Sequence, residues 1–346
     1  MLGVHALMLT RGRLILNHAA SPWACPAPAS YPIAAVSRSG SRPLVSGRGR
    51  GPPMVLLPSP RLPARRMPHE IHAGPVSPDP RPTLDAIRRL QADRAHRDAR
   101  RAFFVEGVRN VAHAIESGFP IETLVYSEKL LVVPIARRLV RERSRAGTPT
   151  LRVSPEEFRQ VSATPRASGV GAVVAQRWSP LHGTSPRAGL CWVVLEAVRS
   201  AGNLGSLIRS SEAIGGAGFI LVGPQVDPFA PAVVRASMGA LFRQTLIRTN
   251  EQSLRNWVRR HRCRVIGASP DGSADLHRFD YPRPTILALG EERRGLTPPQ
   301  RDLCSDFVRI PMVGAADSLN LAVAGSLLLY EVYRARSVKR ARSPGR

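Results

Sequence analysis

An apolar strand, a polar turn and a helical pattern follow one another at residues 191–214. The apolar run Cys191–Leu195 predicts a buried strand, and the polar turn Arg199–Asn203 comes after it. Open α/β sheets bind ligands at such turns, because the free backbone N–H groups there face a crevice. This stretch therefore predicts an α/β fold with a ligand site. Apolar and small residues then recur at helical spacing: Leu204, Leu207, Ile208, Ser211 and Ile214.

Two polar side chains make this stretch a candidate site. Asn203 stands in the predicted turn, and Arg209 follows nearly two helical turns later. An amide and a guanidinium at the mouth of a crevice suit a substrate that carries phosphate or ribose oxygens. A plain strand–helix unit with a solvated Arg209 is the alternative, and this stretch alone does not decide between the two.

The surplus of positive charge indicates a polyanionic partner. The net charge is +25, and after residues 1–69 are set aside there remain 41 basic against 25 acidic residues. Such charge attracts phosphates but does not separate RNA from DNA or from an acidic membrane surface. The most apolar late segment, 319–330, is too short to span a bilayer, so we expect no membrane partner. Four scattered cysteines without a CxxC pair predict neither a metal site nor a disulfide framework.

Composition divides the chain into five segments. Residues 1–82 hold 15 of the 32 prolines and predict a disordered, basic Pro/Arg-rich tail, although their acid-free, Arg-rich opening also resembles an organellar transit peptide. Residues 83–177 predict a small α/β domain, and residues 178–188 a Pro/Gly/Ser linker. We expect a second domain over residues 189–336 and a basic tail over residues 337–346.

Strand and helix signals alternate in both domains. In the first domain a basic helical pattern covers 83–101, and the cap sequence Ser154-Pro155-Glu156-Glu157 predicts a helix start. In the second domain we expect a mainly parallel, doubly wound sheet and a last helix over 318–336, with Ser318 as its cap. The expected strands are 103–105, 121–126, 151–153, 169–175, 191–198, 218–222, 245–247, 264–267, 286–289 and 307–311; further helices are expected at 108–117 and 132–145.

Two later segments also end in polar residues. The strand 286–289 runs into a charged turn bracketed by Gly290 and Gly295, which would permit close backbone approach to a ligand. A carboxylate between them, Glu291 or Glu292, is suited to bind a hydroxyl or a cation, although a surface loop with internally paired charges is the alternative. Ser318 and Asn320 stand at a predicted helix start, where a capping role explains either residue taken singly.

In this order, the three segments resemble the motifs of the SpoU/TrmH-type RNA 2′-O-ribose methyltransferases of the SPOUT superfamily. The region that opens with Phe103–Gly107 resembles the ribosomal-protein-like RNA-recognition domain of many members. Many members have an Asp-Pro pair where this chain has Ser200-Ala201, which we interpret as a difference in specificity. The matching residues are Asn203-Leu204-Gly205 with Arg209, Gly290-Glu291-Glu292 with Gly295-Leu296, Ile310–Gly314 with Ser318–Asn320, and the intervening Val234–Ala240.

This resemblance implies a fold, an activity and a cofactor. The fold is a trefoil-knotted parallel α/β sheet preceded by a small α/β RNA-recognition domain, and the activity is transfer of a methyl group from S-adenosylmethionine to a ribose 2′-hydroxyl. Arg209 would clamp phosphate and activate the 2′-oxygen, since its pKa disfavours a role as base. The resemblance implies further site residues: Asn203, Glu292, Ser318 and Asn320 as positioning residues, and Gly290, Ile310 and Leu319 as cofactor contacts.

The resemblance also implies a homodimer with the active site at its interface, and an RNA partner, rRNA in preference to tRNA. We expect a cytoplasmic location, or import into an organelle if the tail is a transit peptide. A non-catalytic RNA-binding or ribosome-assembly protein that retains the fold is the alternative function. A nicotinamide-dependent dehydrogenase is disfavoured because no G-x-G-x-x-G follows a strand, and no Gly-Lys pair exists for a P-loop.

Overall fold

The computed structural model describes residues 7–10, 13–16 and 79–342, and the chain divides into two compact units, residues 1–68 and 69–346. In the first unit, β1 (Leu7–Thr10) and β2 (Arg13–Leu16) pair antiparallel. The other residues of the predicted tail, up to residue 78, lie outside the described part. Among the described helices, none has the length and apolar character needed to cross a membrane.

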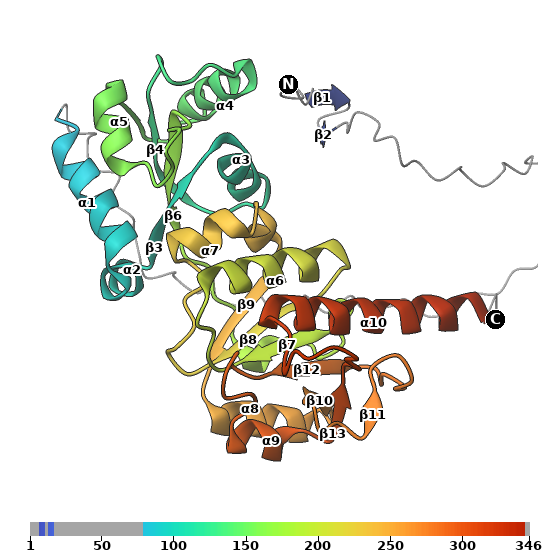
Figure 1. Ribbon diagram of the computed structural model, residues 1–346. Coiled ribbons are helices and arrows are strands. Elements are labelled where there is room, and N and C mark those ends of the chain that lie inside the picture. Colours follow the sequence, from blue (N-terminus) through green and yellow to red (C-terminus); the bar gives the residue numbers. More distant parts are fainter. Residues whose placement is uncertain (1–6, 11–12, 17–78, 343–346) are drawn as a thin grey trace, which may run out of the picture. The chain divides into compact units, whose positions relative to one another are not determined.

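The second unit begins with a four-stranded sheet in the order β3-β6-β4-β5 (Figure 1). The central β6 is antiparallel to both neighbours, and β4 is parallel to β5. Successive side chains of a strand point to opposite faces, so Phe103 packs with α3 while Phe104 packs with α1 and α5. The elements are α1 (Arg81–Ala92), α2 (Arg94–Arg100), β3 (Ala102–Glu106), α3 (Val108–Glu116), β4 (Ile121–Tyr126), α4 (Pro134–Arg145), β5 (Thr150–Arg152), α5 (Pro155–Val161) and β6 (Val170–Ala175).

The helical pattern over 83–101 forms two helices rather than one. Asp93 leaves the helical conformation, and its side chain accepts a hydrogen bond from the N–H of Ala95 at 2.8 Å, which caps α2. The start of α5 was predicted correctly. Ser154 and Glu157 form a reciprocal capping box there, with Pro155 in the first turn.

The later part is a seven-stranded sheet in the order β11-β13-β10-β12-β7-β8-β9, and every adjacent pair is parallel. The predicted parallel sheet is thus confirmed. The short β11, at one edge, was not predicted. The elements are η1 (Leu181–Gly183), β7 (Trp192–Leu195), α6 (Ala201–Ala213), β8 (Gly218–Val222), α7 (Pro231–Ala236), η2 (Ala240–Arg243), β9 (Thr245–Thr249), α8 (Glu251–Arg260), β10 (Arg264–Ala268), β11 (Ala274–Asp275), β12 (Thr285–Leu289), α9 (Pro298–Leu303), β13 (Asp306–Arg309) and α10 (Leu321–Arg342).

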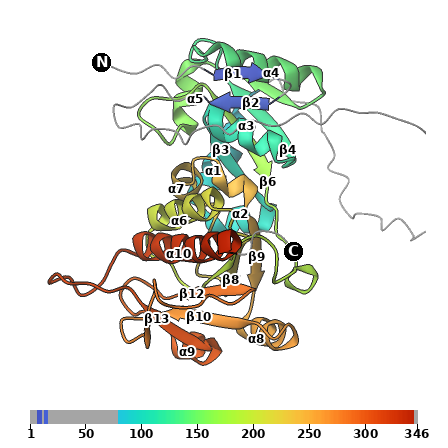
Figure 2. The same ribbon diagram turned by 90° about the vertical axis from the view of Figure 1, so that its right-hand side faces the viewer.

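Helices cover both faces of this sheet, as Figures 1 and 2 show: α6 and α10 lie on one side, and α8 and α9 on the other. The alternation along β7 accounts for this. Val193 and Leu195 are buried in a cluster with α6 and α10, whereas Trp192 and Val194 are buried in a cluster with α8. A strand that is buried on both faces reads as a continuous apolar run, which is why Cys191–Leu195 was recognisable.

After β13 the chain returns to the centre of the sheet, where α10 packs on β12 and α6. The last helix starts at Leu321, three residues later than predicted, and Ser318 does not cap it. Asn320 caps it instead: its side-chain oxygen accepts the N–H groups of Ala322 at 2.9 Å and Val323 at 3.3 Å. The helix continues to Arg342, beyond the predicted boundary at residue 336. The trefoil knot stays a prediction.

The two sheets of the second unit share one apolar core. The ring centroid of Phe103 lies 4.6 Å from that of Phe229, and those of Phe119 and Phe242 lie 5.1 Å apart. Beside these rings, the guanidinium of Arg97 contacts a carboxylate oxygen of Asp227 at 2.6 Å, with both side chains nearly fully buried. The first sheet is therefore held against the second by aromatic packing and a buried ion pair.

Candidate active site

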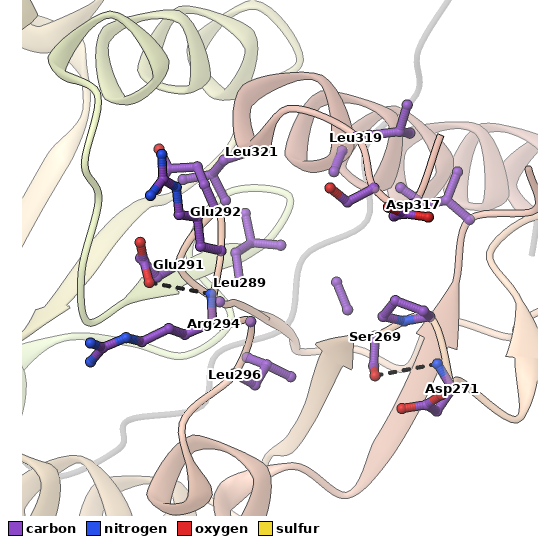
Figure 3. Close-up of a pocket in the computed structure, with 18 of the residues that line it drawn as sticks. Ser269, Asp271, Leu289, Glu291, Glu292, Arg294, Leu296, Asp317, Leu319 and Leu321 are labelled. Carbon is purple, nitrogen blue, oxygen red and sulfur yellow. Dashed lines mark hydrogen bonds between the residues drawn. The ribbon is translucent and has the colours of Figure 1, made fainter. Parts of the chain in front are cut away.

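A cavity of about 450 Å³ opens where β10, β12 and β13 end at their carboxyl termini. Ligands of parallel α/β sheets bind at this edge. In Figure 3, Asp317 and Leu319 lie across the cavity from Leu289 and Glu292, and Ser269 and Asp271 lie below. All three residues predicted as cofactor contacts line this cavity: Gly290, Ile310 and Leu319.

The charged turn after β12 is a tight hairpin. The backbones of Glu291 and Gly295 exchange two hydrogen bonds, at 3.0 and 2.9 Å, and Gly295 has a φ of +66°. A Cβ atom on Gly290 would lie 2.0 Å from the carbonyl carbon of Gly295. We expected these glycines to permit close approach to a ligand, but Gly290 approaches the chain's own backbone. Its conformational role is to close the hairpin that forms one wall of the cavity.

A Gly290→Ala substitution should open this hairpin. The added methyl group meets backbone rather than a movable side chain, so we expect a loss of about 2 kcal/mol in unfolding free energy and weakened ligand binding in the cavity. Thermal unfolding and calorimetric titration with S-adenosylmethionine measure the two effects. Gly314→Ala is the matched control, because a Cβ there meets nothing within 4 Å. Equal behaviour of the two variants would contradict this role of Gly290.

Three polar residues from separate segments form one hydrogen-bonded chain beside the cavity. The side-chain amide of Asn203 donates to a carboxylate oxygen of Glu292 at 2.9 Å, and its carbonyl oxygen accepts from the amide of Asn320 at 2.9 Å. Glu292 also lines the cavity. The structure thus brings together three of the predicted site residues. Along the chain, Glu292 lies 89 positions and Asn320 117 positions after Asn203.

Glu292 holds the turn before α6 in place. Its carboxylate accepts the backbone N–H groups of Arg199 at 3.1 Å and Ser200 at 3.4 Å in addition to the amide of Asn203. Partial burial raises the pKa of this carboxyl, but these hydrogen bonds outweigh it, so that the pKa lies below its ordinary value. Glu292 therefore stays ionised at neutral pH, and its oxygens accept hydrogen bonds from N–H groups of Arg199, Ser200 and Asn203.

The turn in front of α6 is shorter than predicted. Ser200 caps the helix by accepting the N–H of Asn203 at 3.4 Å, so Asn203 lies in the first helical turn. Gly205 serves packing: a Cβ there would lie 2.5 Å from the Cβ of Ala236, because α6 and α7 pack closely. The glycine of the first motif thus fixes where α6 presents Asn203.

Arg209 and Ser318 are not members of the hydrogen-bonded chain. Ser318 lines the cavity and is exposed, and in the described part of the chain its hydroxyl has no hydrogen bond. Arg209 is exposed on α6 and has neither a hydrogen bond nor an ion pair with any described residue. Six helical positions separate it from Asn203, which turns the two side chains about 120° apart around the helix. Arg209 does not line the cavity of this single chain.

The sequence analysis missed several polar residues of the cavity. Glu291 was matched to the second motif but was given no role of its own; it forms an ion pair with Arg199 and helps to hold the turn before α6. Ser269 and Asp271 follow β10, so their place after a predicted parallel strand was a usable signal. Asp317 lines the cavity and makes no hydrogen bond or ion pair with the described residues.

Possible metal ligands and cysteines occur among the described residues. No group of three or more His, Cys, Asp or Glu side chains there is arranged to hold a metal ion. Burial raises the pKa of both the Cys191 and the Cys304 thiol to about 12, so these cysteines are protonated at neutral pH.

Two family models match the chain: the SpoU rRNA Methylase family over residues 191–330 and the MRM3-like substrate binding domain over residues 81–172. A curated relative, the 23S rRNA (uridine(2479)-2′-O)-methyltransferase of Streptomyces viridochromogenes, is 34% identical over 254 residues. The alignment covers 71% of this chain and 88% of the relative.

Solved structures with the same fold include two complexes with AdoMet. The rRNA methyltransferase from Sinorhizobium meliloti, bound to AdoMet, has a TM-score of 0.67 and 35% identity over 73% of this chain and 94% of that chain. The SpoU methyltransferase AviRb from Streptomyces viridochromogenes, in complex with AdoMet, has a TM-score of 0.67 and 32% identity over 74% of this chain and 99% of that chain. With the motif segments brought together and a relative matched over most of its length, the chain belongs to the SpoU rRNA methylase family.

Proposed function

We propose that this protein transfers a methyl group from S-adenosylmethionine to a ribose 2′-hydroxyl of ribosomal RNA. The observation that carries the proposal is the hydrogen-bonded chain Asn203–Glu292–Asn320 beside a cavity lined by Gly290, Ile310 and Leu319. Relatives named as 23S rRNA 2′-O-methyltransferases and neighbours bound to AdoMet support the donor and the class of substrate.

The cavity fits such a donor in size and in chemistry. A volume of about 450 Å³ lies in the usual range for small-molecule sites. Leucines 289, 296, 319 and 321 supply apolar walls, and Asp317 supplies a carboxylate that no described residue neutralises. S-adenosylmethionine carries positive charge on its sulfonium and its ammonium group, and when bound it supplies an electrophilic methyl group. We infer that Asp317 pairs with the ammonium group.

In this proposal the hydrogen-bonded side chains of Asn203, Glu292 and Asn320 position the reactants. The oxygens of Glu292 are occupied by three N–H donors, and the side-chain oxygen of Asn320 caps α10. Both residues therefore act as positioning residues, which keep Asn203 and the two flanking loops at fixed places. Such fixed geometry can lower a group-transfer barrier by several kcal/mol. The unpaired hydroxyl of Ser318 is proposed to bind the ribose.

Arg209 is proposed to bind the phosphate beside the target ribose and to stabilise the 2′-oxygen as its proton leaves. A guanidinium stays protonated in proteins and presents several donors in a planar fork, which suits a phosphate and an oxygen that gains negative charge. Because Arg209 is exposed and has no partner among the described residues, it is available for this contact.

In a homodimer, the second chain would complete the active site around Arg209. On α10, Val323, Leu327 and Tyr330 follow one helical face and are 48%, 42% and 56% exposed. Ser326 of α10 contacts Ser210 of α6 at 2.7 Å, so α10 touches α6 at the residue that follows Arg209. We propose that two chains pack through α10 and that the active site lies at their interface.

A Leu327→Glu substitution should separate the proposed dimer, because it places a charge in an apolar interface. We expect sedimentation equilibrium to show a dimer for the unaltered protein and a monomer for the variant. Val132→Glu is the control, since Val132 is an exposed apolar residue just before α4 rather than on α10. A monomeric unaltered protein, or a variant that stays dimeric, would refute this interface.

Mapping of 2′-O-methyl positions in ribosomal RNA from cells with and without the gene tests the proposed substrate. We expect one ribose methylation to disappear with the gene. Loss of a tRNA methylation instead would redirect the substrate, and loss of none would leave only an RNA-binding role. We propose that the protein acts where ribosomal RNA is made, in the cytoplasm, or in an organelle if the amino-terminal residues direct import.

A further inference from the structure

A second hollow lies on the other face of the seven-stranded sheet, between α8 and the linker segment around η1. Its volume is about 480 Å³. Four of its residues come from α8 and a fifth is the cap that follows it; they stand at positions i, i+3, i+4, i+7 and i+8, which places them on one helical face turned to the linker. The lining residues are Pro180, Leu181, His182, Arg248, Thr249, Ser253, Asn256, Trp257, Arg260 and His261. We call this hollow the linker groove.

The linker groove is suited to bind an anion. It is lined by two arginines, two histidines, two hydroxyls and an amide, and no carboxylate is among its lining residues. The cavity proposed to hold S-adenosylmethionine, here called the donor cavity, differs in this respect. Four carboxylates line it together with three arginines: Asp271, Glu291, Glu292 and Asp317 with Arg293, Arg294 and Arg301. The sheet thus has a site of mixed charge at its edge and a site without carboxylates on the α8 face. Each contact between an arginine and a phosphate contributes affinity that depends on salt.

The structure holds the walls of the linker groove in place. The indole N–H of Trp257 donates to the carbonyl oxygen of Thr184 at 3.3 Å, which fastens α8 to the linker. The guanidinium of Arg248 lies 4.3 Å from the ring centre of Trp178 and pairs with Asp98 at 3.3 Å. Asp98 belongs to α2, a helix that precedes the four-stranded sheet. One end of the groove therefore lies where α2 meets the seven-stranded sheet.

Arg260 is the cation in the groove that is free for a ligand. It is exposed and has no hydrogen bond or ion pair in the described part of the chain, whereas Arg248 is committed to Asp98. The exposed rings of His182 and His261 add N–H donors near it. The hydroxyls of Thr249 and Ser253 are suited to accept or donate to ribose and phosphate oxygens.

We propose that the linker groove binds the sugar–phosphate backbone of an RNA strand. This strand would extend from the region of the four-stranded sheet towards α8. This inference rests on the proposed function, since it assigns a second contact surface to the same substrate. RNA meets the groove's chemistry because it offers phosphates for Arg260 and ribose hydroxyls for the neutral donors and acceptors. The groove would then add affinity outside the methylated nucleotide.

The test compares two neighbouring arginines of α8 in the full-length protein. Arg260→Ala removes the unpaired guanidinium of the groove, and Arg259→Ala removes a charge that is also exposed but lies outside it. Binding of a fluorescent 12-nucleotide oligouridine is followed by anisotropy over a range of salt concentrations. We expect Arg260→Ala to weaken binding about tenfold and to reduce the salt slope by about 1, while Arg259→Ala changes affinity less than about twofold.

A photo-crosslink provides a readout that does not depend on substitution. With 4-thiouridine in the RNA, we expect crosslinked peptides within residues 249–261 or 180–184. Equal effects of the two arginine variants together with no crosslink there would overturn the linker groove as an RNA site. Competition by an acidic peptide but not by RNA would overturn it as well, in favour of a protein partner.

The outcome can be separated from that of the proposed function. Methyl transfer to ribosomal RNA by the unaltered protein tests the activity, and the contrast between Arg260→Ala and Arg259→Ala tests the groove. If transfer fails while the contrast holds, the proposed chemistry is wrong and the groove stands. If transfer succeeds while the two arginine variants behave alike and no crosslink forms in the groove, the groove is wrong and the chemistry stands.

Discussion

Replacement of Arg209 by alanine is expected to reduce methyl transfer about 10³-fold with the folded protein intact. The large effect follows from the loss of a charged donor aimed at an oxygen that becomes negative during the reaction. The unchanged fold follows from the structure, because Arg209 is exposed and contacts no described residue through a hydrogen bond or ion pair. Transfer of a tritiated methyl group to ribosomal RNA measures the first effect, and thermal unfolding measures the second.

Arg209→Lys separates the contribution of the positive charge from that of the planar guanidinium. A lysine keeps the charge but loses the planar fork, so we expect activity between those of the alanine variant and the unaltered protein. Binding of S-adenosylmethionine should be the same in all three proteins, since Arg209 does not line the donor cavity. An alanine variant that keeps full activity would remove Arg209 from the mechanism.

Replacement of Glu292 by alanine is expected to cost about 10²-fold in methyl transfer and to destabilise the loops around the cavity. The substitution leaves the N–H groups of Arg199 and Ser200 and the amide of Asn203 without their acceptor. The turn before α6 then loses its fixed position relative to the hairpin after β12. Single-turnover rates and calorimetric binding of S-adenosylmethionine distinguish lost positioning from lost donor binding. Glu156→Ala, which removes an exposed carboxylate of α5, is the control.

The pH dependence of Glu292→Gln gives a further readout. The folded pKa of Glu292 is depressed, so its contribution to stability is present above the ordinary carboxyl pKa and is lost as pH falls through the folded value. The difference in unfolding temperature between unaltered protein and variant should therefore be largest at neutral pH and shrink under acid conditions. A constant difference at all pH values would mean that the ionised carboxylate does not hold the turn.

The sequence predicted the sheet well because the strands are buried on both faces. Runs such as Cys191–Leu195 and Gly218–Val222 are apolar without interruption, which is typical of central strands in a parallel sheet. The ends of the helices were predicted less well, because they depend on which side chain caps the helix. Asp93 divides one helical pattern into two, and Asn320 rather than Ser318 starts the last helix, because either side chain is able to cap in isolation.

The convergence of Asn203, Glu292 and Asn320 was predicted only through the resemblance. Spacing alone assigned each of them an ordinary role, as cap, turn residue or surface charge, and tertiary contacts across 89 and 117 positions are not visible in a local pattern. The linker groove was invisible for the same reason. Its arginines come from β9 and α8 and its histidines from the linker and the residue after α8, and it exists only once the linker packs on the helix.

The measurement that tests the account most directly is the chemical identity of the methylated product. Ribosomal RNA from cells that lack the gene is incubated with the protein and with S-adenosylmethionine tritiated in its methyl group, and is then hydrolysed with alkali. We predict tritium in alkali-stable dinucleotides, because a 2′-O-methyl ribose blocks cleavage of the next phosphodiester bond. Tritium in mononucleotides with a methylated base, or no transfer by protein that binds the donor, would contradict ribose methylation.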